Sequence, residues 1–224
     1  MVDEEAPARE RLRLSTEAHL FRVYLISSGG PGPGELVAAV RAALSALPPG
    51  SAAVQLREKG LSGRELALLA RALVEACRER EAPLFINDRA DVAMAAGAAG
   101  VHLPGSGLPA REARALLGPS ALIGASCHSA KDLENARAGG ADFAVFGPVW
   151  STPGKGAALG AAALGAVARD SRLPIFALGG IDSTNAAEAI RQGAQGVACV
   201  RAVLGAADPR AAAARLWSAI EVAL

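Results

Sequence analysis

The sequence predicts a single (β/α)8 barrel, residues 21–224, preceded by a short N-terminal extension, residues 1–20. After residue 20, eight short apolar stretches alternate with eight stretches of helical periodicity, which is the order of elements in a parallel α/β barrel. Five of the apolar stretches run directly into polar clusters, as they do where a barrel builds an active site at the carboxyl ends of its strands. The length of 224 residues suits one domain of this kind.

The predicted strands are short and rich in Val, Ile, Leu and Phe. They cover residues 22–26, 52–56, 84–86, 100–103, 121–124, 143–146, 175–178 and 196–200. A doubly wound open sheet is the alternative fold, but no Gly-x-Gly-x-x-Gly follows the first strand, as that fold requires when it binds a dinucleotide.

The predicted helices carry recognisable signals at their ends. Ser62 and Glu65 have the spacing of a capping box, and Pro109 and Gly118 mark the beginning and end of a later helix. Three further turns place glycine between a helix and the next strand, where a left-handed backbone is needed. We expect helices over residues 35–47, 62–81, 91–96, 109–118, 130–138, 164–169, 184–192 and 209–222.

Bulk composition excludes several classes of partner. A formal net charge of +1 and a pI near 7.8 give no electrostatic reason to bind nucleic acid or an anionic membrane. No apolar run is long enough to span a membrane, and Met1–Leu14 lacks the apolar core of a signal peptide. Three widely spaced cysteines form no metal-like pair and fit a reducing cytoplasm. The expected partners are small molecules; the oligomeric state, a homo-oligomer included, is left open.

A basic cluster follows the second strand. Gln55, Arg57 and Lys59 alternate along its end, so their side chains can point the same way. Arginine and lysine suit a diphosphate, one as a bidentate fork and the other as a point charge. Lys155, in a loop rich in proline and glycine, is placed to clamp the same group. The alternative interpretation is a solvated basic strand end.

A phosphate site is predicted after the seventh and eighth strands. Gly179 and Gly180 follow the seventh strand, and Val200–Arg201 end the eighth. Barrels commonly bind phosphate here, because glycine lets backbone N–H groups approach an oxyanion. The alternative is that the paired glycines only form a turn.

Two other strand ends carry polar side chains. Asn87 and Asp88 follow the third strand and suit a hydroxyl, a phosphate or Mg²⁺. His128 follows the fifth strand, where a neutral imidazole can transfer a proton at physiological pH; a structural histidine is the alternative. We interpret His102, inside a strand, as structural, and His19 carries no signal.

Taken together, these segments resemble the thiamine-phosphate synthase/TenI family from Val23 to Pro209. The matching segments are residues 54–59, 86–89, 100–103, 126–129, 146–152 and 177–181. The synthases of this family join a pyrimidine diphosphate to a thiazole phosphate and release pyrophosphate. The resemblance implies three groups of site residues: Gln55, Arg57, Lys59, Asn87 and Lys155 for the diphosphate, Asp88 for Mg²⁺, and Ser126, Thr152, Gly179, Gly180, Val200 and Arg201 for the thiazole phosphate.

Two positions depart from the synthase pattern. Gly107 stands where synthases carry a second magnesium-binding Asp, and in Thr152–Lys155 a glycine, Gly154, replaces the second Thr of a Thr-x-Thr-Lys motif, so that a hydroxyl is lost. TenI proteins are similar in lacking this metal set. We therefore favour a TenI-like thiazole tautomerase that needs no cofactor, with His128 as acid/base; Lys155 is the other catalytic candidate. The alternative is a Mg²⁺-dependent thiamine-phosphate synthase, and a further alternative is a regulator that binds phosphate ligands without turnover.

Overall fold

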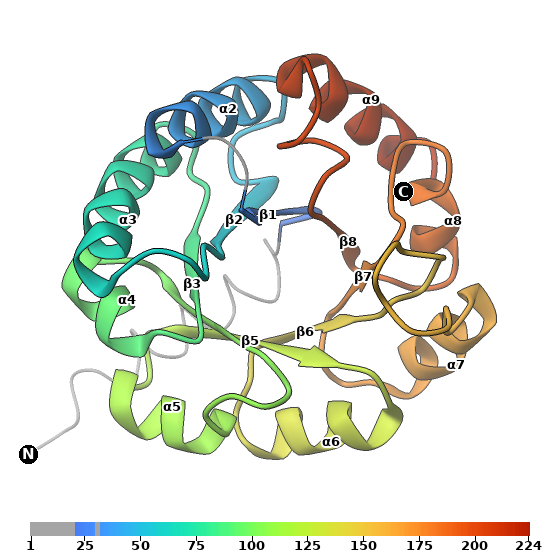
Figure 1. The fold of residues 1–224 in the computed structure, drawn as a ribbon. Helices are drawn as coiled ribbons and strands as arrows, with labels where there is room; N and C mark the ends of the chain where they lie inside the picture. The colour runs from blue at the N-terminus through green and yellow to red at the C-terminus, as the bar shows by residue number, and fades with distance from the viewer. Residues whose placement is uncertain (1–20, 30–31) are drawn as a thin grey trace, which may run out of the picture.

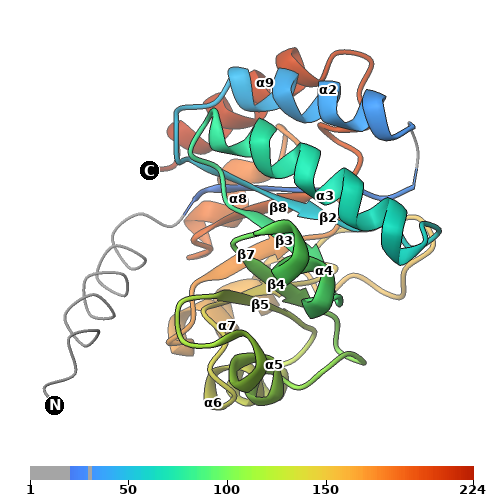
Figure 2. The same ribbon diagram turned by 90° about the vertical axis from the view of Figure 1, so that its left-hand side faces the viewer.

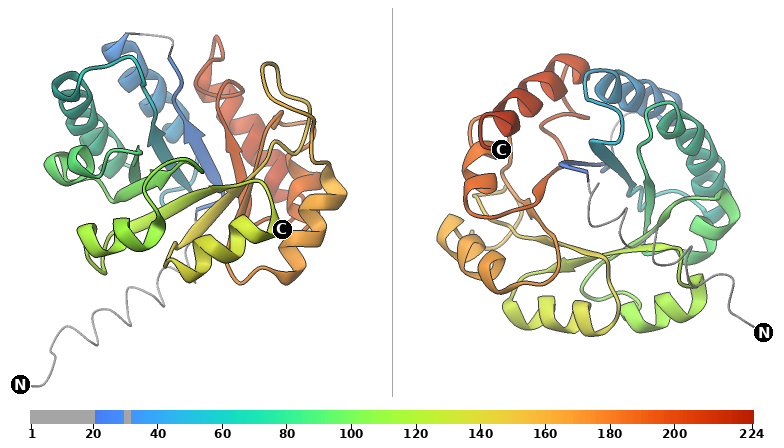
Figure 3. Two further views of the ribbon diagram at one scale, coloured as in Figure 1. Left: turned by 60° about the horizontal axis from the view of Figure 1, so that its bottom comes forward. Right: turned by 180° about the vertical axis from the view of Figure 1, so that it is seen from behind.

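The computed structural model describes residues 21–29 and 32–224, and within them the strands close into one parallel barrel. Neighbouring strands pair in chain order and β8 pairs with β1. Figure 1 shows this barrel end-on, with the helices forming a ring around it; the ring is also visible from behind (Figure 3). The strands are β1 (Val23–Ile26), β2 (Ala52–Leu56), β3 (Leu84–Asn87), β4 (Gly100–Leu103), β5 (Leu122–Cys127), β6 (Phe143–Phe146), β7 (Ile175–Leu178) and β8 (Gly196–Cys199). The predicted barrel is confirmed.

The helices begin and end close to the predicted positions. They are α2 (Pro33–Ser45), α3 (Gly63–Arg78), α4 (Ala90–Ala96), α5 (Ala110–Leu117), α6 (Ala130–Ala138), α7 (Ala161–Asp170), α8 (Ala186–Arg191) and α9 (Pro209–Glu221). The capping box at Ser62 and Glu65 is present, and Gly118 ends α5 as expected. Pro109 occupies the N-cap of α5 rather than its first turn. The predicted extension, residues 1–20, lies outside the described residues.

One strand differs from its prediction in a way that affects the site. β5 was expected to end at Gly124 but continues to Cys127, because Ser126 pairs with Val145 and Cys127 with Phe146 of β6. Small residues such as these have little strand preference of their own, and the neighbouring strand supplies the hydrogen bonds that extend β5. Ser126 is therefore a strand residue with a fixed direction.

Aromatic side chains fill the inside of the barrel. Phe21, Tyr24, Phe85, Phe143 and Phe176 form a buried cluster, with Phe21 and Phe176 stacked at 4.6 Å between ring centroids. A second, larger core lies between the outer faces of the strands and the helices. Side chains alternate between the two along each strand, as in other barrels, and the filled interior closes the barrel below the ends of the strands.

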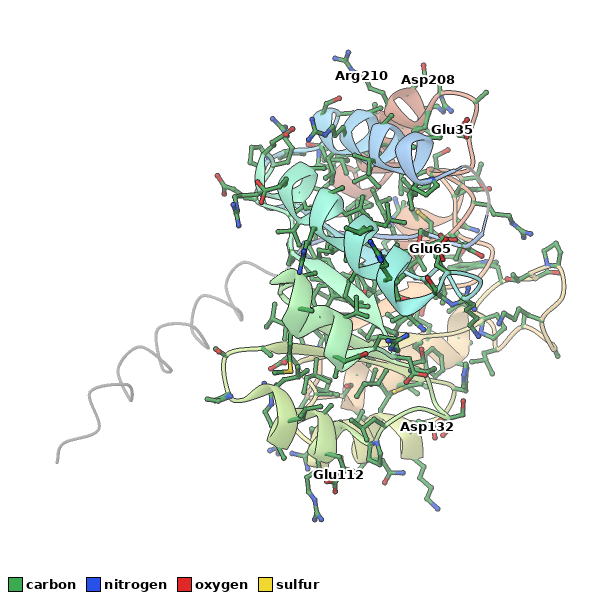
Figure 4. All side chains as sticks on the ribbon, turned by 60° about the vertical axis from the view of Figure 1, so that its left-hand side comes forward. Glu35, Glu65, Glu112, Asp132, Asp208 and Arg210 are labelled. Carbon is green, nitrogen blue, oxygen red and sulfur yellow. The ribbon has the colours of Figure 1, made fainter. Side chains whose placement is uncertain are left out.

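The loops that carry the predicted site residues lie together at one end of the barrel. In the side view of Figure 2, the strands run toward the end where the helices begin. Several of these helix beginnings carry a carboxylate in the first turn, as at Glu35, Glu65, Glu112 and Asp132 (Figure 4), where it interacts favourably with the helix dipole. Over the part of the chain that the structure describes, no helix is long and apolar enough to cross a membrane.

Candidate active site

A cavity of about 1090 Å³ opens at the carboxyl ends of the strands. It is lined by side chains and backbone at the ends of all eight strands, or directly after them, and from the loops that follow. The predicted site residues that line it are Gln55, Arg57, Lys59, Asn87, Ser126, His128, Thr152, Lys155, Gly179, Gly180, Val200 and Arg201. Asp88 is not among the lining residues that the structure describes. Residues far apart in the sequence are thus brought to one place, with four cationic side chains among them.

The end of β2 supplies the basic side chains, and the strand alternation sets their depth. Gln55 is 1% exposed, and its Nε2 donates to the Tyr24 hydroxyl at 3.1 Å. Two residues further on, Arg57 is half-buried, and Lys59 is exposed. The Arg57 backbone N–H donates to Ser27 Oγ at 2.9 Å, which ties this strand end to β1. The row therefore runs from the barrel interior to its rim.

Glu58 is a lining residue that the sequence analysis did not single out. Its carboxylate accepts the Gly29 backbone N–H at 2.9 Å, so it holds the loop after β1 beside the basic row. In the sequence, Glu58 stands between Arg57 and Lys59, which suggests only that it pairs with one of these cations. The contact with Gly29, 29 residues away, has no signal in the sequence.

The buried His102 contacts Ser126 inside the cavity. The His102 Nε2 lies 3.0 Å from Ser126 Oγ, and the imidazole is 3% exposed. Burial, with a smaller contribution from the charge of Arg57, lowers the pKa of His102 to about 3, so the ring is neutral at physiological pH. We predicted a structural role for His102; it is indeed buried, but it also lines the cavity. The contact depends on the register of β4 and β5, which pairs His102 with Gly124, two residues before Ser126.

His128 is exposed at the cavity wall and is oriented from two sides. Its backbone N–H donates to Asp132 Oδ2 at 2.9 Å, and this bond is the main reason that the pKa of Asp132 is lowered. Its Nδ1 lies 2.5 Å from the Gly147 carbonyl oxygen. A carbonyl oxygen only accepts, so Nδ1 carries a proton. In the neutral ring, Nε2 is then unprotonated and can take up a proton.

The loop after β6 presents Thr152 and Lys155. The Thr152 hydroxyl donates to the Trp150 carbonyl at 3.0 Å, and the Lys155 backbone N–H donates to the Thr152 carbonyl at 3.1 Å. These bonds form a compact turn from which the exposed Lys155 side chain reaches the cavity.

The glycines after β7 both line the cavity and receive the loop after β6. Gly179 and Gly180 have φ angles of 101° and 63°, which glycine adopts without strain. A Cβ at Gly179 would lie 2.5 Å from Pro148 Cα, and one at Gly180 would lie 2.7 Å from the Ser151 carbonyl oxygen. The glycines thus allow a close approach of two loops and also form part of the cavity wall, so the predicted phosphate site stays a prediction.

Asp88 lies beside Gly107 with an unusual backbone conformation. Its φ of 59° is one that aspartate tolerates better than most residues, and its N–H donates to the His102 carbonyl at 3.0 Å. A Cβ at Gly107 would lie within 2.4 Å of Asp88 Oδ1. Because Gly107 has no side chain, the Asp88 carboxylate can occupy the space beside it.

The carboxylate of Asp88 could hold Mg²⁺ only together with oxygens from a bound substrate. Within residues 21–29 and 32–224, no three His, Cys, Asp or Glu side chains form a group that could hold a metal ion. Magnesium is commonly held by one or two carboxylates together with substrate phosphate oxygens. Asp88 can supply the one carboxylate, so a phosphorylated substrate would have to supply the other charged oxygens.

Comparisons with known proteins identify the family. The family model described as "Thiamine monophosphate synthase" matches residues 23–203. The chain is 41% identical over 200 residues to the thiamine-phosphate synthase of Moorella thermoacetica, covering 88% of this chain and 93% of that protein. It is 44% identical over 176 residues to the thiamine-phosphate synthase of Chlorobium luteolum, covering 77% and 83%.

A solved structure agrees with these sequence relatives. The thiamine phosphate pyrophosphorylase from Pyrococcus furiosus superposes with a TM-score of 0.82 at 32% identity, covering 91% of this chain and 97% of that one. The fold, the order of the motifs and the relatives lead to one conclusion: the chain belongs to the thiamine-phosphate synthase/TenI family.

Proposed function

We propose that this protein is a thiamine-phosphate synthase. The observation that carries the proposal is the convergence of Arg57, Lys59, Lys155 and Arg201 from three separate regions on one cavity. A tautomerase handles a single phosphorylated substrate, whereas a synthase must hold a diphosphate and a phosphate together. The relatives named above are called synthases or a pyrophosphorylase, which favours this alternative over the tautomerase that the sequence analysis preferred.

The proposed roles follow the position of each residue around the cavity. Arg57, Lys59 and Lys155, with the amides of Gln55 and Asn87, would bind the diphosphate. Ser126, Thr152, Gly179, Gly180 and the backbone at Val200–Arg201 would bind the phosphate of the thiazole. As the pyrimidine-methyl group passes to the thiazole, its bond to the diphosphate breaks and negative charge grows on the departing pyrophosphate. Fixed cations stabilise such developing charge.

Asp88 would hold Mg²⁺ against the diphosphate, where the ion would supply further charge neutralisation. The Gly107 position contributes no second carboxylate, so the ion would depend on the substrate oxygens for its affinity. We therefore propose that Mg²⁺ binds this protein much more tightly with the diphosphate present than without it.

The tautomerase remains the second candidate because of one observation. His128 has Nδ1 bonded to the Gly147 carbonyl, which leaves Nε2 as a proton acceptor at the cavity wall. A tautomerase would use this nitrogen to move a proton on the thiazole ring and would need no metal.

The decisive experiment mixes the purified protein with thiazole phosphate and hydroxymethylpyrimidine diphosphate, with Mg²⁺ or with EDTA. We expect thiamine phosphate and pyrophosphate in the presence of Mg²⁺ and neither in EDTA. If no product forms while thiazole phosphate still binds, the synthase proposal is wrong. Turnover of the thiazole carboxylate phosphate tautomer would then support the second candidate, and binding without any turnover would support a regulator.

A further inference from the structure

The His102–Ser126 pair contains a buried nitrogen without a partner. His102 Nδ1 is buried, and among the described residues it has no hydrogen-bond partner. The rings of Tyr24 and Phe143 lie 5.7 and 6.0 Å from the His102 ring between centroids. On another side the backbone of Gly124 is so close that a Cβ there would lie 2.7 Å from Nδ1. Nδ1 is thus enclosed in a packed region in which the described residues offer it no acceptor.

The surroundings of Nδ1 decide where the single proton of the neutral ring resides. A buried N–H without an acceptor is rarer in proteins than a buried acceptor without a donor. The proton is therefore better placed on Nε2, which has Ser126 Oγ as its partner at 3.0 Å. In this tautomer His102 donates and Ser126 Oγ accepts.

This direction leaves the Ser126 hydroxyl proton free for the cavity. The contact with His102 is the one hydrogen bond of the Ser126 side chain within the described residues, and Ser126 lines the cavity. A hydroxyl whose oxygen already accepts a strong bond has its own proton left to donate. Phosphate oxygens accept and do not donate when ionised, so they match such a hydroxyl.

We propose that His102 is a positioning residue: its Nε2–H donates to Ser126 Oγ and thereby directs the Ser126 hydroxyl proton toward a phosphate oxygen of the substrate. The inference rests on the proposed function only in taking a phosphorylated molecule as the ligand. The roles proposed above for the synthase reaction do not include His102, and this inference gives it one.

The first test is the tautomer of His102 in the wild-type protein. The chain contains three histidines, so the imidazole nitrogens in a ¹⁵N NMR spectrum can be assigned with His19→Gln and His128→Gln variants. We expect His102 at pH 8 to show a protonated Nε2 and an unprotonated Nδ1. A protonated Nδ1 would overturn the proposal, and this measurement needs no His102 variant to fold.

The second test is a double-mutant cycle read by calorimetric binding of inorganic phosphate and of pyrophosphate. His102→Leu removes the donor, whereas His102→Gln keeps an N–H donor at a similar distance. We expect His102→Leu to weaken the binding of at least one of the two anions by about tenfold, the effect of one hydrogen bond. His102→Gln should restore most of that affinity.

The Ser126→Ala background separates positioning from a general effect on the core. If His102 acts through the hydroxyl, His102→Leu should have no further effect on anion affinity once Ser126 is alanine. An equal loss in both backgrounds, or a His102→Gln variant as weak as His102→Leu, contradicts the proposal. If His102 and Ser126 are coupled in anion binding but the protein makes no thiamine phosphate, this inference holds and the synthase proposal fails. If the protein makes thiamine phosphate but the two residues are not coupled, the synthase proposal holds and this inference fails.

Discussion

Ser126 and His128 stand two residues apart at the end of β5, yet their surroundings give them different chemistry. Ser126 is half-buried and faces inward, where the neutral His102 contacts it. His128 is exposed and is oriented by the Gly147 carbonyl and the Asp132 carboxylate. Two residues of separation at one strand end thus give one side chain a buried partner and leave the other exposed at the cavity wall.

Replacing Lys155 by methionine tests the role of the cation in the loop after β6. We expect kcat/KM for thiamine phosphate formation to fall at least tenfold, because the variant loses a charge beside the departing pyrophosphate. Steady-state kinetics measures the change. Lys131→Met, an equally conservative change at an exposed position of α6, is the matched control and should behave as the wild type. Equal rates for the two variants would remove Lys155 from the proposed site.

Replacing His128 by asparagine separates the two candidate reactions. Asparagine can keep a donor near the Gly147 carbonyl but cannot exchange a proton at neutral pH. We expect thiamine phosphate formation to keep its rate within about tenfold, because the synthase step relies on charge stabilisation more than on a proton acceptor. A loss of several hundredfold in an assay of the product would show that His128 takes part in the chemistry of coupling.

Among the elements, the helix ends that carry a local sequence signal were the boundaries best predicted. The capping box of α3 and the glycine that ends α5 are local signals, formed within a few residues. The end of β5 was misplaced because Ser126 and Cys127 gain their strand conformation from β6. A local pattern thus identifies an element, but its neighbour in space decides how far it extends.

Arg114 joins several elements at the amino-terminal end of the barrel. Its guanidinium donates to the Ala121 carbonyl at 2.5 Å, the Gly140 carbonyl at 3.0 Å and Asp142 Oδ2 at 2.7 Å. The Asp142 carboxylate also accepts the Ile123 N–H at 2.7 Å. One side chain therefore connects α5 to the beginnings of β5 and β6.

We expect Arg114→Met to reduce the free energy of unfolding by about 2–3 kcal/mol, because it leaves partly buried carbonyls and a carboxylate without their charged donor. Urea denaturation measures this. Arg111→Met, on the same helix with the Arg111 side chain 85% exposed, is the control and should change stability by less than about 0.5 kcal/mol. A similar loss in both variants would mean that the helix, rather than the guanidinium network, is affected.

At the scale of the whole molecule, the buried His102 links stability to pH. Its pKa of about 3 in the folded protein lies below the unfolded value of about 6.5, so the unfolded chain binds a proton that the folded protein does not. The contribution to stability is complete above pH 6.5 and is lost progressively as the pH falls from 6.5 toward 3, at about 1.4 kcal/mol per pH unit.

Urea unfolding at pH 7, 6 and 5 tests this linkage. We expect the wild type to lose about 2 kcal/mol more than His102→Gln between pH 7 and pH 5, since glutamine does not titrate. The carboxylates with lowered pKa, Asp91 and Asp132 among them, take effect at lower pH and are common to both proteins. If the free energy of unfolding depends on pH equally in both proteins, the pKa of His102 in the folded protein is not lowered, and the prediction is wrong.

The barrel, the order of its elements and twelve of the residues that line the cavity could be predicted without the structure. Polar clusters such as Gln55–Lys59 and Asn87–Asp88 mark strand ends, and the carboxyl ends of parallel strands in a barrel always meet at one face. The family could be predicted for the same reason, because its motifs lie at these strand ends. The reaction that this family member performs could not be predicted, because the losses at Gly107 and Gly154 favour one reaction and the retained basic residues favour the other.

The contacts that cross from one strand end to another could be found only in the folded protein. The His102–Ser126 bond depends on the register of β4 against β5, and the fit of Asp88 over Gly107 depends on the loop after β4. The Glu58–Gly29 bond likewise joins two separate strand ends. Sequence periodicity fixes which face a side chain takes along its own strand, but register and loop conformation arise from pairing between distant segments. The contacts of these residues could therefore be identified only from the structure of the folded barrel.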